Sequence, residues 1–242
     1  MTDLPVYLWL ITFAGSAGIA TMTGIVIYNA SIRASLGRRR AAGITTVSAL
    51  IIGGWFVFST VFAANGGYQI HPGAHTMLWL PVAVVVFGGG LFLLSLLPIV
   101  QQVLRAPGIN QSLMHPHWFR VVGIVFLTAM LLGALPPLFA LPAGLGDLAV
   151  SFAAPFVAAK LARGEGYRAA VWWNVLGITD LALALTLGGL AAFGFLPGSP
   201  AVVIITVLPL VIIPTAPVPL LIVLHVRSLL ALSRDKRSRA IV

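Results

Sequence analysis

Cysteine is absent from this chain of 242 residues, so the chain contains no disulfide, no thiolate metal site and no cysteine nucleophile. Charged residues are also scarce, at 8% of the sequence. Soluble domains carry about 25%. Hydrophobic residues make up 60%. These proportions exclude a water-surrounded globular domain and predict an integral membrane protein.

Sequence motifs of common enzyme and cofactor classes are missing as well. The chain has no HExxH motif, no paired-aspartate motif and no phosphate-binding loop. The sequence therefore predicts no enzyme activity and identifies no cofactor. One enzymatic alternative stays open, a membrane-embedded lipid-modifying enzyme that uses His115, His117 or His225.

Seven apolar segments, separated by glycine, proline or charged residues, are long enough to cross a bilayer. The first has no basic residues ahead of it, so we interpret it as a span and not as a cleaved signal peptide. The predicted fold is all-α, a single bundle of seven transmembrane helices with a basic tail at 233–242. The expected spans are about 7–30, 42–64, 77–104, 117–139, 146–162, 172–195 and 201–232.

The basic residues are distributed asymmetrically along this topology. With seven crossings, all 14 Lys and Arg residues fall on one side of the membrane. The positive-inside rule then places the N-terminus outside and the C-terminus in the cytoplasm. The net charge of +9 is explained by contact with anionic lipid headgroups, so we expect the bilayer and no nucleic acid as a partner. Arg far exceeds Lys, and Ala, Gly and Leu are abundant, which is consistent with a GC-rich bacterial genome, so we expect a bacterial plasma (inner) membrane. The oligomeric state does not follow from the sequence.

Asp180 is the main candidate functional residue, because it is a carboxylate in the middle of the sixth apolar segment. At about 1.5 Å per residue it lies roughly 18 Å beyond Arg168, near the middle of a hydrocarbon core about 30 Å thick. A carboxylate at that depth costs about 3 kcal/mol or more to insert, so it should face other helices. Asn174 falls on the same arc of the helical wheel.

The last apolar segment is rich in proline, which removes a backbone donor and interrupts a helix. Pro214, Pro217 and Pro219 are expected at the depth of Asp180. Freed backbone carbonyls beside a midplane charge are typical of transporter binding sites. The alternative is a kinked helix in which a neutral Asp180 is hydrogen-bonded to Asn174 or to a neighbouring helix.

Three further positions are candidates for specific roles. Asp147 follows two glycines at the expected start of the fifth span, where it either meets the helix dipole or forms an outer station of a proton path to Asp180. His225, near the cytoplasmic boundary, is a candidate pH-sensitive gate or an ordinary hydrogen-bonded residue. His71 and His75 are weak metal-ligand candidates, because a Pro-Gly pair between them argues against a regular helix.

Together these features predict a small membrane transporter or channel that binds a small molecule or ion at a midplane site, with proton coupling as one version. The alternative from another class is a non-catalytic seven-helix sensor or assembly partner. Its outer loop and basic tail would then be the contact surfaces.

Overall fold

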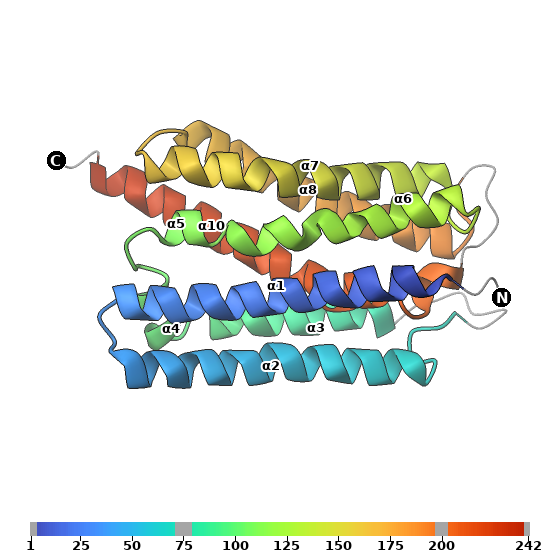
Figure 1. The fold of residues 1–242 in the computed structure, drawn as a ribbon, viewed down its shortest axis with the longest axis horizontal. Coiled ribbons are helices and arrows are strands. Elements are labelled where there is room, and N and C mark those ends of the chain that lie inside the picture. Colours follow the sequence, from blue (N-terminus) through green and yellow to red (C-terminus); the bar gives the residue numbers. More distant parts are fainter. Residues whose placement is uncertain (1–3, 71–78, 197–202, 240–242) are drawn as a thin grey trace.

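The structure is a computed structural model that describes residues 4–70, 79–196 and 203–239. Every regular element in these ranges is helical. The long helices run along the longest axis of the molecule, and α10 crosses obliquely between the α1–α2 pair and the α7–α8 pair (Figure 1). The elements are α1 (Val6–Arg33), α2 (Arg38–Ala64), α3 (Trp79–Leu94), α4 (Pro98–Val103), α5 (Ile109–Ser112), η1 (His115–Gly123), α6 (Ile124–Leu131), α7 (Pro137–Ala162), α8 (Tyr167–Ala192), η2 (Val203–Thr206), α9 (Ile212–Thr215) and α10 (Pro217–Arg239).

Five helices among the described residues are long and apolar enough to cross a membrane, namely α1, α2, α7, α8 and α10. Their outward faces carry large apolar side chains, such as Leu50 at 69% exposed and Phe156 at 71% exposed. An apolar surface of this kind is compatible with contact to lipid tails. The prediction of an all-helical, multi-pass membrane protein is therefore confirmed.

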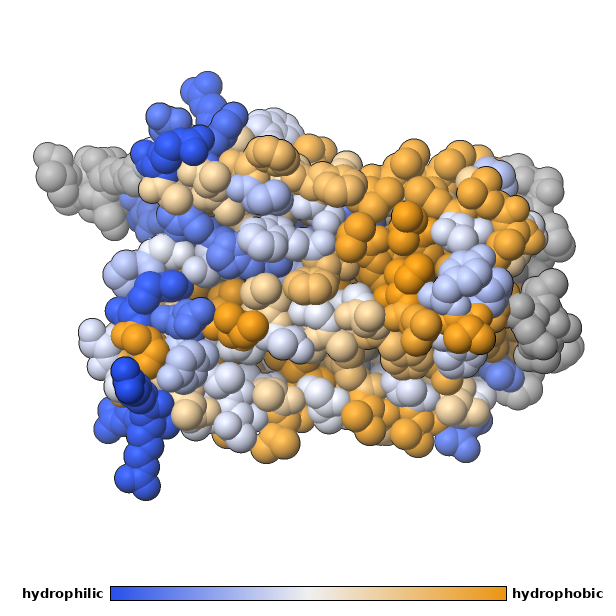
Figure 2. Space-filling model, viewed as in Figure 1, coloured by the Kyte–Doolittle hydropathy of each residue, from blue (hydrophilic) through white to orange (hydrophobic). Residues whose placement is uncertain are grey.

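Hydrophilic residues gather at one end of the molecule, as Figure 2 shows. This end, here called the basic end, carries the α1–α2 loop, the α7–α8 turn and the C-terminal part of α10 (Figure 1). Apolar residues dominate the surface toward the opposite end in the same view (Figure 2).

The boundary between the expected fourth and fifth spans lies elsewhere in the structure. The expected spans 117–139 and 146–162 leave residues 140–145 as the connection between them, but α7 begins at Pro137 and continues through these residues. Pro137 occupies the first turn, where a missing N–H costs nothing, so the helix starts there. Asp147 consequently lies ten residues inside a continuous helix, and its interpretation as a helix-terminal residue is wrong.

The expected span at 77–104 is interrupted in the structure. Helix α3 ends at Leu94, and the chain resumes as α4 at Pro98, because the residue before a proline is forced out of the helical region. The freed carbonyl of Ser95 accepts hydrogen bonds from Arg227 Nη2 (2.5 Å) and Gln101 Nε2 (2.6 Å).

The predicted interruption of the last segment is present, since η2, α9 and α10 replace one continuous helix. Pro219 has no N–H, so the carbonyl of Thr215 cannot form the usual bond four residues along. Trp55 Nε1 on α2 donates to this carbonyl at 2.8 Å. The Thr215 hydroxyl also accepts from Ser59 Oγ at 2.8 Å. The broken backbone is thus satisfied by α2.

Candidate functional site

Arg120 lies in the interior of the bundle with an exposed fraction of only 1%, and its three side-chain nitrogens contact three different helices. Nε donates to Asp147 Oδ1 on α7 at 2.7 Å. Nη2 donates to Asp180 Oδ2 on α8. Nη1 lies 3.2 Å from His225 Nε2 on α10. The guanidinium therefore joins η1, α7, α8 and α10 at one point.

The 3₁₀ geometry of η1 directs the side chain of Arg120 into the interior of the bundle. A 3₁₀ helix has three residues per turn, so side chains three apart align on one face. His117, Arg120 and Gly123 have this spacing, and all three are buried. A Cβ on Gly123 would overlap with Asp147. The absence of a side chain there lets the two segments approach closely enough for the Arg120–Asp147 ion pair.

Two more glycines make room for the other partners of Arg120. A Cβ on Gly146 of α7 would overlap with Asp180 Oδ1. A Cβ on Gly177 of α8 would overlap with the ring of His225. Small residues allow close approach of helices in lipid. In this bundle they create the space that the polar groups fill.

The hydrogen bonds of Asn174 identify the tautomer of His225. Asn174 Nδ2 donates to Ala170 O (2.8 Å) and to Ser228 Oγ (3.0 Å), so its Oδ1 is an acceptor. His225 Nδ1 lies 2.9 Å from this Oδ1 and must be the protonated ring nitrogen. In a neutral ring Nε2 then carries the lone pair that faces Arg120.

His117 is fully buried beside this network without joining it by a hydrogen bond. Neither ring nitrogen has a partner among the described residues. Its ring centroid lies 3.9 Å from that of His225 and 5.0 Å from that of Trp173. Trp173 is itself fixed by a 3.0 Å bond from Nε1 to Val150 O. His117 is thus a second imidazole within the interior of the bundle, held by ring packing.

We call Arg120, Asp147, Asp180, His117 and His225 the polar cluster. With both carboxylates ionised and both imidazoles neutral, its formal charge is −1. An unbalanced charge in a low-dielectric interior is costly, so one bound proton brings the cluster to neutrality. The two carboxylates and the two imidazoles are the groups that can hold it. The chemistry that this arrangement supports is reversible uptake of a proton.

A narrow cavity of about 50 Å³ connects the polar cluster with the broken last segment. A buried water needs about 10–15 Å³ of such volume and two to four polar partners, and Asp147 is the ionisable side chain that this cavity offers. Asp147 of the polar cluster and Pro214 of the last segment both line this cavity. The remaining lining is largely apolar and includes Phe126, Phe139, Leu181, Gly188, Ile205 and Val218.

The structure brings Asp180, Asn174, Asp147 and His225 together, although the sequence suggested separate roles for them. The three candidate prolines of the last segment lie in different surroundings. Pro214 shares the narrow cavity with Asp147, Pro217 begins α10, and Pro219 packs against Gly88 of α3.

The other histidines lie outside the polar cluster. His115 packs against Trp118, with ring centroids 4.8 Å apart. His71 and His75 lie outside the described residues. In the described part of the chain no group of three His, Cys, Asp or Glu residues is arranged to hold a metal ion.

Sequence reasoning gave Arg120 no functional role and counted it only among the basic residues of the cytoplasmic side, and it named His117 only for the enzymatic alternative. In the structure both side chains are buried, and the segment that carries them, η1, packs against α1 and α7. Two signals were available. His117, Arg120 and Gly123 are spaced by three, and two intramembrane carboxylates require a cation.

Comparison with known families gives one match, to the family described as "Domain of unknown function (DUF8737)", over residues 77–233. This range is more than half of the chain and contains the whole polar cluster. No curated protein and no solved structure matches the chain.

The glycine contacts predict how two matched substitutions differ. Gly177→Ala forces a methyl group into the ring of His225, so we expect the free energy of unfolding to fall by about 1–3 kcal/mol. Gly54→Ala on α2 meets no atom within 4 Å, so it should be neutral or slightly stabilising. Thermal unfolding in detergent compares them, and equal midpoints would contradict the close packing.

The ion pairs predict a larger loss for Arg120→Leu, which leaves the buried Asp147 and the partly buried Asp180 without their cation. We expect destabilisation by about 3–5 kcal/mol in the same unfolding assay. Combining it with Asp147→Asn and Asp180→Asn should recover much of the loss, because no buried charge remains. Arg38→Leu at the exposed start of α2 is the control. If Arg120→Leu unfolds like this control, Arg120 does not hold the helices together.

Proposed function

The chain belongs to the DUF8737 family, and we propose that it is a proton-coupled membrane transporter whose coupling site is the polar cluster. The observation that carries this proposal is a buried Arg120 paired with carboxylates on two different helices. Ionisable groups inside a membrane are costly and mark ion or proton pathways. Asp180 is 13 residues from the start of α8 and 12 from its end, so the pair lies halfway along the helix.

We further propose seven passes, with the N-terminus outside and the basic end in the cytoplasm of a bacterial cell. Helix α3 and the continuous η1–α6 segment supply the two passes beyond the five long helices. A 3₁₀ helix rises about 2.0 Å per residue, so the nine residues of η1 and the eight of α6 together reach about 30 Å. That length equals the thickness of the hydrocarbon core, about 30 Å.

The coupling step is an exchange of partners around Arg120. A proton bound by Asp180 removes the charge that holds Nη2, while Asp147 and His225 still hold Nε and Nη1. Loss of one ion pair frees α8 to move relative to η1. Long 3₁₀ stretches are uncommon and often mark functional hinges, and η1 is nine residues long. The 3₁₀ segment is therefore the element that we expect to move.

The narrow cavity extends from Asp147 to Leu80 and Ile205, toward the end opposite the basic end, and in the proposal protons reach Asp147 from that end. On the basic side of Arg120, Asn174 accepts from His225 Nδ1, so His225 Nε2 is the atom that can take up a proton. In the proposal the proton enters at Asp147, is held at Asp180 and leaves at His225. Asp147 and His225, the predicted outer station and gate, take these roles in the proposal.

Proton flux tests the coupling site directly. In liposomes that enclose a pH dye, an imposed membrane potential should drive proton uptake by the wild-type protein. Asp180→Asn should abolish the uptake, because the amide cannot exchange a proton. Glu165→Gln, an exposed acid in the α7–α8 turn, should leave it unchanged.

Thermal unfolding should first establish that both variants are folded. Unchanged flux in Asp180→Asn would remove the mechanism. A folded wild-type protein that moves no protons would contradict a proton pathway through the polar cluster that operates without a co-substrate.

The orientation is tested by single cysteines, which the cysteine-free chain permits. Asn65→Cys follows α2, and Gln102→Cys lies in α4 beyond α3; both positions are exposed. In intact bacteria a membrane-impermeant maleimide should label Asn65→Cys and should reach Gln102→Cys only after permeabilisation. Labelling of both positions in intact cells would show that α3 does not cross the membrane.

A further inference from the structure

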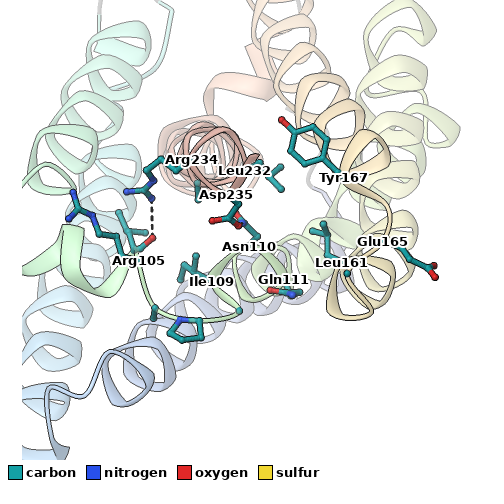
Figure 3. A pocket seen from close by; sticks show the side chains of 16 residues that line it. Arg105, Ile109, Asn110, Gln111, Leu161, Glu165, Tyr167, Leu232, Arg234 and Asp235 are labelled. Carbon is teal, nitrogen blue, oxygen red and sulfur yellow. Dashed lines mark hydrogen bonds between the residues drawn. The ribbon is translucent and has the colours of Figure 1, made fainter. Parts of the chain in front are cut away.

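A larger cavity, of about 620 Å³, lies at the basic end, between the α4–α5 loop, the α7–α8 turn and the C-terminal part of α10 (Figure 3). Its volume is within the range of about 300–1,000 Å³ that is usual for small-molecule sites. None of its lining residues belongs to the polar cluster. It is therefore a separate site, and what it binds does not depend on the proposed transport function.

One side of this cavity carries two arginines. Figure 3 shows the guanidinium groups of Arg105 and Arg234 on the same side of α10. Arg234 Nη2 donates to Leu104 O at 3.0 Å, which fixes this side chain at the cavity wall. Arg105 is exposed in the loop that follows α4. Paired guanidinium groups with several N–H donors match the oxygens of a phosphate.

The neighbouring wall carries hydrogen-bond acceptors. Asn110 Nδ2 donates to Asp235 Oδ2 at 2.7 Å, which positions the carboxylate (Figure 3). Asn110 itself is buried, with 6% exposed, and its Oδ1 accepts no hydrogen bond from the described residues. Asn110 thus positions the exposed carboxylate of Asp235, which is the acceptor that this wall offers to a ligand. Glu165, by contrast, points away from the cavity (Figure 3).

We propose that this cavity binds a phosphate ester whose adjoining arm carries a hydroxyl or an ammonium group. Arg105 and Arg234 contact the phosphate oxygens, and Asp235, held in place by Asn110, accepts from the arm. The headgroups of phosphatidylglycerol and phosphatidylethanolamine have this chemistry, and so does free glycerol 3-phosphate. The cavity lies where α7 ends and α8 begins, beside the polar surface of the basic end, which is the level of lipid headgroups.

Binding to detergent-purified full-length protein tests the site, with calorimetry as the readout. Dioctanoyl phosphatidylglycerol should bind at least about tenfold tighter than dioctanoyl phosphatidylcholine, whose arm has the same phosphate but no donor. Arg105→Gln should weaken binding of phosphatidylglycerol about tenfold, the effect of one lost charge-assisted hydrogen bond. Arg38→Gln, which removes an exposed arginine outside the cavity, should leave binding unchanged.

A second variant keeps the test decisive for the acceptor side. Asp235→Ala should reduce the preference for phosphatidylglycerol over phosphatidylcholine while binding of the phosphate persists. Glycerol 3-phosphate distinguishes the sources: Arg105-dependent binding of comparable strength identifies a soluble phosphate ester as the ligand, and much weaker binding identifies a lipid. Equal binding of the two lipids, or equal effects of Arg105→Gln and Arg38→Gln, would overturn the proposal.

Discussion

A single guanidinium group holds the centre of this membrane protein together. Arg120 is buried at 1% exposed, and its nitrogens reach Asp147, Asp180 and His225 on three helices. A charge in such an interior persists only when opposite charges and hydrogen bonds surround it. This requirement explains the 3₁₀ path of η1, which aims Arg120 inward, and the glycines at 123, 146 and 177, whose missing side chains admit the polar groups.

The same rule governs the rest of the bundle, because lipid cannot satisfy backbone groups. The interruption at Pro219 frees the carbonyl of Thr215, and Trp55 of α2 supplies the missing donor. The interruption before Pro98 frees the carbonyl of Ser95, and Arg227 of α10 binds it. Helix breaks in this chain are therefore sites of contact between elements. They tie α10 and the preceding α9 to helices that are distant in sequence.

Sequence reasoning named four of the five residues of the polar cluster but did not connect them with Arg120. Asp180 and Asn174 were found because a carboxylate and an amide on one arc of an apolar helix stand out against their surroundings. Arg120 was not, since it follows a polar segment and resembles an ordinary residue of a basic loop. Asp147 was found for an incorrect local reason, because Gly144 and Gly146 suggested a turn. In the structure those glycines instead admit Leu127 and Asp180 against a continuous helix.

Composition and hydropathy alone determined that this is an all-helical membrane protein, because a bilayer imposes the same length and polarity on every span. They also determined that Asp180 would need partners. Only the tertiary structure decided which ones, since pairing depends on how helices pack and on the few ångströms of reach of each side chain. An arginine can set topology from a loop or neutralise acids in the interior, and the sequence pattern is the same in both cases.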